Sequence, residues 1–544
     1  MKHRTRESSR RRRGGWIAGA LLPALLCLLP RAALGAAASV SAGDTRFSNG
    51  SRVVYHKGYG YWAFYSNGSE FVYRFSPDGV NFTTAETEVV QDESGGQNPG
   101  EMGSVYHLEV TSRVFVLVGD GDPPISPPGT PYNKLFLKRG TLQPDGTISW
   151  GSLFERGLNC SMNSWPGQHR AGMSGGIALL GTSESGSISY AAGGWSCEVS
   201  GGNCRQGRDY FGFIGQTGAS AGGTFSGATT VCGADNNKDS PNPTQVFAGV
   251  VAVNDGGTWK TIVAYRDDKD SARWFFDLYN GATYEVQEMQ FNTVDTNFNT
   301  EGYGVSMVSE PNSSVVHVAY VDGLGNLVYA RRASAGNWPV KNVLIDDAGG
   351  TATETNAVKH PAIAFLENGA SDEIVVVYVM PNGDLKYARG STSINSPAGW
   401  TYTTWKTGAG HSWPTMPRMV TVPDPIPVAY TVGGNVVFDR IITSSNPDPT
   451  VSAITPDTVG AGAGIVDASV DTTYDIELSG TGFIQTPGVS FQRGGATLGG
   501  VTVTSVTWIA DATKVRVHFS VDQTVPPGPF DLEVVNPDAR SGLK

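Results

Sequence analysis

Ionisable and amide side chains stand on segments that each lead into a short run of small and apolar residues. They are Arg46, Glu101, His169, Arg170, Asn242, Glu301, Lys359, His360 and His411. Two carboxylates across one opening could act as acid and base on a glycosidic bond, so Glu101 and Glu301 are the candidate catalytic pair. The other seven are candidate ligand-binding residues for an acidic or hydroxyl-rich ligand. The alternative is that several of these side chains fill a channel with hydrogen bonds and water.

These side chains come together only if the segments that carry them belong to a ring of similar units. The stretch "GNLVYARR" (Gly325 to Arg332) returns as "GDLKYARG" (Gly383 to Gly390), and each follows an apolar, β-branched run and a glycine-containing turn. This pattern predicts a hairpin of two strands. Looser copies recur at spacings of roughly 50 to 70 residues, which is typical of a repeat architecture.

A further strand is expected before each hairpin, because polar residues or proline lead there into small and then alternating apolar residues. Small residues suit the innermost strand of a propeller blade, where strands converge on the axis. The sequence therefore predicts an all-β chain with a β-propeller of six or seven blades over residues 39–442. A pair of stacked sandwiches is the alternative. In a propeller, the segments before the innermost strands surround one mouth of the central channel.

One turn of the predicted propeller resembles a known motif. In "SPDGVNFT", Ser76, Asp78, Gly79 and Phe82 resemble the Asp-box, S-x-D-x-G-x-x-W, of the sialidase-like (BNR) propellers, with one residue fewer between Asp and Gly. The stretch "QPDGTISW" (Gln143 to Trp150) is a more degenerate copy. The resemblance implies that the aspartate braces the turn by accepting backbone N–H bonds, which is a structural role.

The same resemblance has consequences for catalysis. Sialidases use an arginine cluster and a tyrosine nucleophile, but "TRFSNG" stands here where the arginine-containing R-I-P motif is expected. This departure argues against sialidase activity. Tyr55, Tyr106 and Tyr303 are numerous enough to include a nucleophile, and we interpret each as a packing residue.

The last part of the chain resembles a second family. After a linker at residues 443–449, the motifs are I-x-P at Ile454 to Pro456, "GTGF" at Gly480 to Phe483, and "PGPFDLEVVNPD" at Pro527 to Asp538. They resemble, in order, those of the IPT/TIG immunoglobulin-like domains. The resemblance implies a C-terminal immunoglobulin-like β-sandwich over residues 450–544 that acts as a spacer or adhesion module and carries no catalysis.

The first 38 residues read as a signal peptide. Basic residues up to Arg13 precede an apolar run, Trp16 to Leu29, and the small residues Ala33 to Ala38 offer a cleavage site. The alternative, a transmembrane segment, fits less well because the run is short and is interrupted by proline. The leader carries a net charge of +7 in a chain of −11, which leaves −18 for the remainder. So acidic a chain is not expected to bind nucleic acid or anionic lipid.

Four cysteines and one acidic run are the candidates for disulfides or metal sites. Cys160, Cys197, Cys204 and Cys232 form an even set, which in an exported protein predicts two disulfides with three pairings open. Zinc is the alternative, but no CxxC pair is present. The run "DNNKD" (Asp235 to Asp239) resembles a calcium loop, yet Ser240 replaces the turn glycine, so a solvated loop is favoured. We therefore expect no metal and no cofactor, with calcium the one weak candidate.

These features together favour an exported protein of bacterial type, secreted or held at the cell surface and not membrane-spanning after processing. We interpret it as a recognition protein that binds carbohydrate or another extracellular polar polymer at the propeller mouth. One alternative is a glycoside hydrolase that uses Glu101 and Glu301. Another is a non-catalytic structural component of a surface layer or appendage.

Overall fold

The structure of the chain is a computed structural model, which describes part of the 544 residues. The described residues are 38–43, 45, 51–67, 70–77, 79–82, 84–89, 103–108, 111–119, 134–157, 167–183, 186–200, 203–219, 225–234, 249–266, 273–280, 283–292, 304–349, 357–369, 371–421, 425–441, 450–455, 472–483, 487–493, 496–510, 513–522, 524–525, 530–535 and 541–543. No helix within these ranges is long and apolar enough to cross a membrane.

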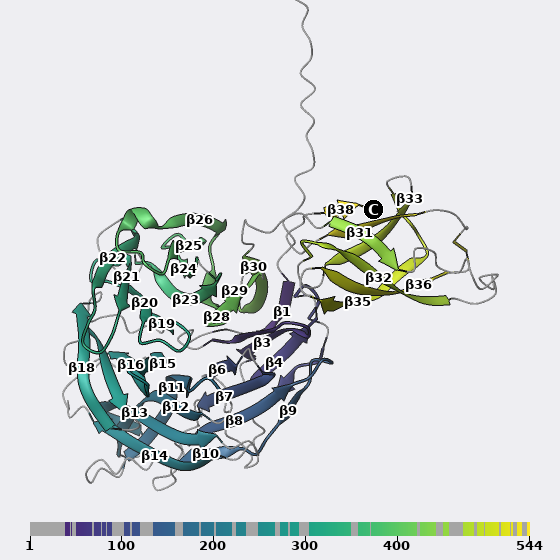
Figure 1. The fold of residues 1–544 in the computed structure, drawn as a ribbon. Helices are drawn as coiled ribbons and strands as arrows, with labels where there is room; N and C mark the ends of the chain where they lie inside the picture. The colour runs from purple at the N-terminus through teal and green to yellow at the C-terminus, as the bar shows by residue number, and fades with distance from the viewer. Residues whose placement is uncertain are drawn as a thin grey trace, which may run out of the picture. The chain divides into compact units, whose positions relative to one another are not determined.

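Seven sheets of four or five strands follow one another along the described chain, and we call them blades 1 to 7 (Figure 1). Blade 1 contains β2 (Val53–His56), β3 (Gly60–Ser66), β4 (Phe71–Ser76) and β5 (Thr87–Glu88). Blade 2 contains β6 (Gly103–Leu108), β7 (Arg113–Gly119), β8 (Lys134–Leu142), β9 (Ile148–Trp150) and β10 (Phe154–Gly157). Blade 3 contains β11 (Gly167–Leu180), β12 (Ser187–Ser200), β13 (Asn203–Ala219) and β14 (Phe225–Ala234). Blade 4 contains β15 (Gly249–Asp255), β16 (Thr258–Arg266), β17 (Arg273–Asn280) and β18 (Thr283–Asn292).

Blade 5 follows the same plan, and blades 6 and 7 depart from it. Blade 5 contains β19 (Val305–Ser309), β20 (Val316–Val321), β21 (Leu327–Arg332) and β22 (Val340–Asp346). Blade 6 contains β23 (Lys359–Glu367), β24 (Glu373–Val379), β25 (Leu385–Ser391) and β26 (Thr401–Lys406), with a short 3₁₀ helix, η2 (Pro397–Gly399), before β26. Blade 7 contains β27 (His411–Thr415), β29 (Ile426–Val432), β30 (Asn435–Ile441) and β1 (Ala38–Ala42). Strand β28 (Met419–Thr421) adds to blade 6 by pairing in parallel with β23.

The blades form a closed ring, so the predicted propeller is confirmed with seven blades. The innermost strands of neighbouring blades contact each other in the order β2, β6, β11, β15, β19, β23 and β27, and β2 also contacts β29 of blade 7. Strand β1 closes the ring from the other end of the chain, because it pairs antiparallel with β30 as the outer strand of blade 7. A stack of two sandwiches would not bring these seven strands around one axis.

The repeated hairpin is explained by the geometry of its turn. Gly325 and Gly383 have φ of +80° and +87°, in the left-handed region that other residues rarely adopt. A Cβ on Gly383 would lie 2.7 Å from the Cα of Ala409, so space as well as conformation requires glycine there. In the first copy, the carboxylate of Asp322 accepts the backbone N–H of Leu324 (2.8 Å) and of Asn326 (3.0 Å). The turn is therefore specified locally.

The degenerate Asp-box copy is braced in the way that the sialidase resemblance implies. The carboxylate of Asp145 accepts the backbone N–H of Thr147 at 2.9 Å and its hydroxyl at 2.7 Å. Gly146 follows with φ of +87°. Trp150 packs edge-on against Tyr73 of blade 1. Asp78 of the better copy lies outside the described residues, so the family resemblance itself stays a prediction.

The propeller cores lie between blades. One cluster joins Trp274 and Phe276 of blade 4 to Val318 and Tyr320 of blade 5, and similar clusters join blades 1 and 2, 5 and 6, and 6 and 7. Blade 7 meets blade 1 through a cluster that includes Phe438. Because each large side chain buried in this way contributes roughly 1.5–3 kcal/mol, the packing of neighbours holds the ring together.

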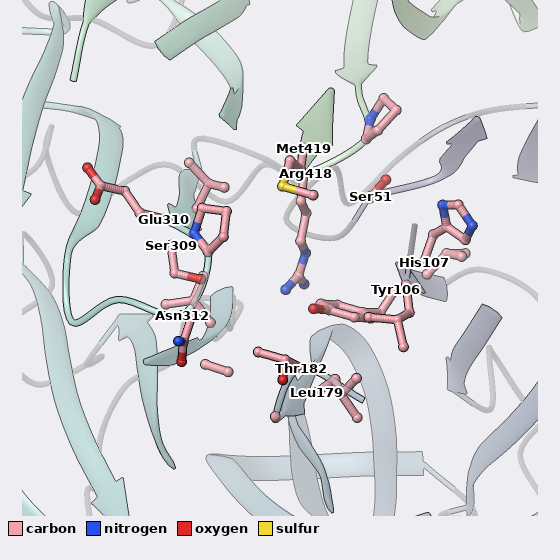
Figure 2. A pocket seen from close by; sticks show the side chains of 18 of the residues that line it. Ser51, Tyr106, His107, Leu179, Thr182, Ser309, Glu310, Asn312, Arg418 and Met419 are labelled. Carbon is pink, nitrogen blue, oxygen red and sulfur yellow. The ribbon is translucent and has the colours of Figure 1, made fainter. Parts of the chain in front are cut away.

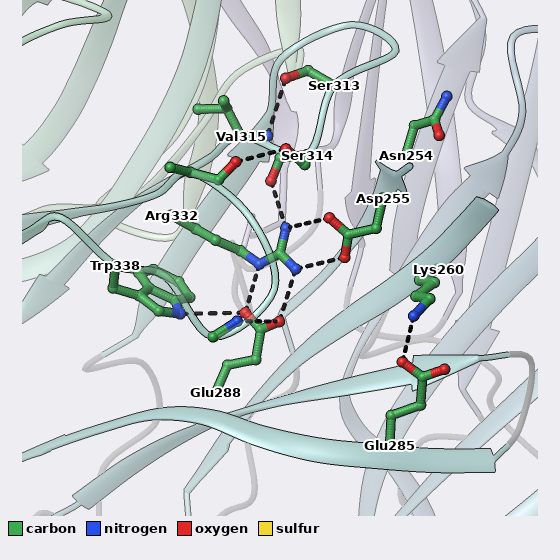
Figure 3. A network of polar contacts seen from close by, with 12 residues as sticks. Asn254, Asp255, Lys260, Glu285, Glu288, Ser313, Ser314, Val315, Arg332 and Trp338 are labelled. Atoms are coloured by element: carbon green, nitrogen blue, oxygen red, sulfur yellow. Dashed lines mark hydrogen bonds and ion pairs between the residues drawn. The ribbon is translucent and has the colours of Figure 1, made fainter. Parts of the chain in front are cut away.

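A polar network reinforces the contact between blades 4 and 5 (Figure 3). Arg332, at the end of β21, is fully buried and uses all five of its N–H groups. They bond Glu288 (2.5 and 2.7 Å), Asp255 (2.7 and 3.1 Å) and the Ser314 carbonyl (2.6 Å). The indole of Trp338 donates to Glu288 at 3.2 Å. Burial acts to lower the pKa of Arg332, but the bonds to Glu288 and Asp255 outweigh it and raise the pKa.

The C-terminal part contains two four-stranded sheets with one core between them. One sheet is ordered β31 (Thr450–Thr455), β32 (Thr472–Thr481), β36 (Lys514–Val521) and β35 (Val501–Ala510); the other is ordered β34 (Ala496–Thr497), β33 (Gly488–Arg493), β37 (Asp531–Val535) and β38 (Ser541–Leu543). Leu478 and Val517 of the first sheet pack with Phe491 and Leu532 of the second. Phe483 of the "GTGF" motif is buried in the same core. This layering is that of a β-sandwich, and the IPT/TIG assignment stays a prediction.

Several predictions fall outside the described residues. They concern the leader up to residue 37, the linker 443–449, Cys160 and the run Asp235 to Asp239. The backbones of Cys197, Cys204 and Cys232 lie in β12, β13 and β14, but their side chains are outside the description. The predicted disulfides and the boundaries of the leader and linker therefore stay predictions. Among the described residues, no group of three or more His, Cys, Asp or Glu side chains could hold a metal ion.

The Arg332 network generates a stability prediction. Replacing Arg332 with Met leaves the buried carboxylate of Glu288 without its cation, so we expect the free energy of unfolding to fall by about 3–5 kcal/mol. Urea denaturation followed by tryptophan fluorescence would measure the change. The control is Lys260→Met, which breaks the more exposed pair with Glu285 and should cost about 1 kcal/mol or less. Equal losses in the two variants would show that Arg332 is not the dominant contact.

Candidate functional site

The structure describes the side chains of only three of the predicted site residues. Glu101, Glu301, Arg46 and Asn242 lie outside the described residues, and so do the side chains of His169 and Arg170 in β11. The catalytic pair is therefore untested and stays a prediction. Lys359 and His360 begin β23, and His411 begins β27. All three stand at the leading ends of innermost strands, where the sequence predicted them.

His360 and His411 both have structural partners. The ring of His360 stacks on Trp413 with 3.8 Å between ring centres, and its Nδ1 accepts the Trp413 backbone N–H at 3.2 Å. Both residues have positive φ, +52° and +54°, at irregularities where blades 6 and 7 begin. His411 Nδ1 donates to the carbonyls of Gly383 (2.8 Å) and Gly408 (2.9 Å). The two histidines thus tie turns and strand starts together.

A cavity lies on the propeller axis, and none of these three residues lines it. We call it the axial cavity (Figure 2). Six segments contribute to it, and examples from each are Ser51, Tyr106, Thr182, Trp259, Glu310 and Arg418. Its volume is about 210 Å³. Residues more than 300 positions apart in the sequence therefore meet at one site.

The innermost strands contribute to the axial cavity at different points: blade 1 through Ser51 and Val53 at the leading end of β2, and blades 2, 3 and 5 through the trailing parts of their strands. Thr182 follows β11, Glu310 follows β19, and Tyr106 is in the second half of β6. Met419, next to Arg418, pairs with Phe365 in the second half of β23. The sequence prediction placed the site at the leading ends of these strands. None of the three predicted residues with described side chains lines the axial cavity, and the predicted mouth stays a prediction.

Arg418 supplies a positive charge to the axial cavity. Its backbone carbonyl accepts the N–H of Phe365 at 2.8 Å, which anchors the segment to β23. Its guanidinium lies over the ring of Tyr106, 5.4 Å from the ring centre, a favourable cation–π contact. Within the described part of the chain, no carboxylate forms an ion pair with this side chain. Burial lowers the pKa of Arg418 to about 10 and the nearby Tyr106 opposes this, so the group stays charged at neutral pH.

His107, which lines the axial cavity, and its neighbour His56 stay uncharged at neutral pH. Burial, and then the neighbouring His56, lower the pKa of His107 to about 3. Burial likewise lowers the pKa of His56, whose ring stacks on Tyr59 at 4.0 Å. The Nε2 atom of His107 is buried and makes no hydrogen bond to any described residue. At neutral pH the cationic character of the cavity therefore comes from Arg418.

Glu310 also lines the axial cavity, but its carboxylate is already engaged. Its Oε1 accepts the Nε2 proton of the buried His317 at 3.1 Å, and His317 Nδ1 accepts the Tyr329 hydroxyl at 2.6 Å. The bond from His317 lowers the pKa of Glu310, so Glu310 is ionised at neutral pH. Figure 2 shows its carboxylate turned away from the Arg418 guanidinium. The two charges are therefore separate features of the cavity wall.

Sequence reasoning missed Arg418 and treated Tyr106 as a packing residue. Arg418 stands in "HSWPTMPRMVTV", a segment recognised as leading into an innermost strand, and it is the only lysine or arginine there. That lone charge beside Pro417 was the available signal. The sequence could not show that β28 pairs in parallel with β23, which places the Arg418 side chain in the cavity.

Comparisons with known proteins add little to this picture. No family model matches the chain, and no curated protein matches it. Three similar solved structures are AofleA from Arthrobotrys oligospora (10% identity, TM-score 0.36, covering 65% of this chain and 94% of that one), the six-bladed, fucose-recognising lectin of Aleuria aurantia (14%, 0.34, 68% and 100%), and the periplasmic gluconolactonase PpgL of Pseudomonas aeruginosa (10%, 0.36, 74% and 94%). Likeness at this level carries no argument about function.

The histidine at the cavity edge generates a pH prediction. The unfolded chain takes up a proton at His107 near pH 6.5, but the folded chain does so only near pH 3. Stability is therefore lost as pH falls through this window, by up to about 1.4 kcal/mol per pH unit. We expect His107→Gln to lack this loss. Between about pH 7 and about pH 4, the free energy of unfolding should therefore fall less in the variant than in the wild type.

Urea denaturation at a series of pH values would test this. The reference variant is His518→Gln, which changes a partly exposed histidine of β36 that is paired with Asp475, and reports what loss of an imidazole does elsewhere. A pH dependence in His107→Gln that parallels the wild type would refute the assignment.

Proposed function

We propose that this protein is a recognition protein that binds a polar ligand, carbohydrate or another polar polymer, through the axial cavity. One observation carries the proposal. The guanidinium of Arg418 projects into an open cavity and has no ionic partner among the described residues (Figure 2). A charged donor group in such a position is suited to a ligand that brings acceptor atoms.

The other lining residues support binding of a ring with hydroxyl groups. Trp259 and Tyr106 offer aromatic faces, which bury apolar area at small entropic cost. Thr182 and Ser309 offer hydroxyls, and Asn312 offers an amide whose Oδ1 is held by Asn254 at 2.7 Å. Sites for drug-sized molecules usually have volumes of about 300–1,000 Å³. The axial cavity is smaller, so it suits one sugar ring or the end of a polymer.

The described cavity favours binding over glycoside hydrolysis. Hydrolysis of the usual kind needs two carboxyl groups about 5 to 10 Å apart. The described lining of the axial cavity contains one carboxylate, Glu310, which is occupied by His317. The predicted pair Glu101 and Glu301 is outside the described residues and stays a prediction.

The setting of this activity is part of the same proposal. The basic and apolar leader supports export, so we place the mature protein, from about Ser39, outside the cytoplasmic membrane. The motifs at Gly480 to Phe483 and Pro527 to Asp538 support an IPT/TIG-like domain over residues 450–544. It would act as a spacer or adhesion module beside the binding propeller.

A substitution in the aromatic wall tests the proposal. The mature full chain would be screened against a glycan array, and the strongest ligand measured by isothermal titration calorimetry. We expect Trp259→Ala to weaken binding by about tenfold or more, because the ring that packs against the ligand is removed. The matched control is Tyr402→Ala, which removes an aromatic ring exposed on the outer strand β26 and should leave the affinity unchanged.

Two results would count against the proposal. If no glycan on the array binds, carbohydrate is ruled out as the ligand class. If Trp259→Ala and Tyr402→Ala bind the ligand as tightly as the wild type, the site lies elsewhere.

A further inference from the structure

Arg418 differs from Arg332, a buried arginine whose N–H groups all have acceptors. Arg332 has five N–H groups and five acceptors, and both of its carboxylate partners are protein side chains. For Arg418, the contact that its side chain makes with the described chain is the face of the Tyr106 ring. The fold thus supplies counter-ions for one guanidinium and leaves the other facing a cavity.

The partly buried guanidinium of Arg418 needs water or a ligand in the cavity to complete its contacts. A guanidinium withdrawn from bulk water loses hydration, and a cation–π contact with one ring recovers only part of it. In a partly enclosed cavity the attraction between opposite charges is stronger than in water. A negative group that enters the cavity would therefore be held mainly by this side chain.

The shape of the guanidinium selects the shape of that negative group. A guanidinium is planar and presents its N–H groups along its edges. A planar carboxylate accepts two parallel hydrogen bonds from such an edge.

The charge count of the described lining limits the ligand to one negative charge at this point. His107 is neutral and cannot add a second positive charge, and Glu310 contributes a negative one. A dianionic phosphate would leave one charge without compensation and would be repelled by Glu310. A single carboxylate matches the one cation.

We infer that the axial cavity selects ligands with a carboxylate, a uronic acid unit of an acidic polysaccharide, which Arg418 binds in a bidentate pair. The inference rests on the proposed function of the cavity as a glycan-binding site. It adds the ligand class and gives Arg418 the role of specificity residue. Trp259 would contact the sugar ring, and Thr182 and Ser309 its hydroxyls.

The test compares each acidic polysaccharide with its own neutral form. Probes are polygalacturonate, alginate and hyaluronan oligosaccharides, each alongside a carboxyl-reduced sample that keeps the sugar stereochemistry. Affinities for the mature full chain would be measured by calorimetry. We expect at least one acidic probe to bind at least about tenfold more tightly than its reduced form, because a charge-assisted bidentate pair contributes that much affinity. Arg418→Gln should abolish that preference, and Arg418→Lys should keep part of it.

The possible results separate this inference from the proposed function. If acidic and reduced probes bind equally, and Trp259→Ala weakens both, the cavity binds glycans but the carboxylate inference is wrong. If the preference for the acidic probe persists in Arg418→Gln, the inference is also wrong. If no probe of either kind binds and the array is also blank, both fail. Melting temperatures of the variants would show whether they are folded. The comparison of acidic and reduced probes on the wild-type protein needs no variant at all.

Discussion

Closure of the ring by β1 and β30 is the constraint on which the other features depend. These strands lie some 400 residues apart in sequence, yet Ala38 pairs with Phe438 and Ala42 with Asn435. The Gly43 N–H continues the ladder by bonding the Gly434 carbonyl at 3.0 Å, and the hydroxyls of Thr45 and Thr431 meet at 2.9 Å. Because both ends of the propeller segment share one sheet, the first and last blades are held together by backbone hydrogen bonds as well as by side-chain packing.

A closed ring has a consequence for its axis. Seven innermost strands converge there, so small and β-branched residues occupy most inner positions, as in β15 and β23. Charged side chains at the axis are therefore costly unless they are paired, or unless they face water or a ligand. Glu310 is paired, because its carboxylate accepts a hydrogen bond from His317. For Arg418, the described protein provides the Tyr106 ring and an open cavity, which is why this residue stands out as a binding group.

Local features could be recognised without the structure. The hairpins were predictable because Gly325, Gly383 and Asp322 define their turns within a few residues, and because alternating apolar residues define the strands. The repeat distance then implied a ring. The two-sheet layering around Leu478 and Phe491 agreed with the expected sandwich for the same reason. By contrast, Arg418 was not among the expected site residues, because the cavity that it lines is assembled from strand segments of several blades.

The sequence by itself determined the strands, their turns and the general architecture, because these depend on neighbours along the chain. The tertiary structure decided the number of blades, the closing strand and the place of the cavity. It also decided that Arg332 is surrounded by carboxylates, whereas Arg418 has the Tyr106 ring beside it. The environment of each guanidinium is made by residues from separate blades, and the positions of those blades are set by packing around the ring. Sequence spacing carries no information about such a meeting of distant strands until the ring is closed.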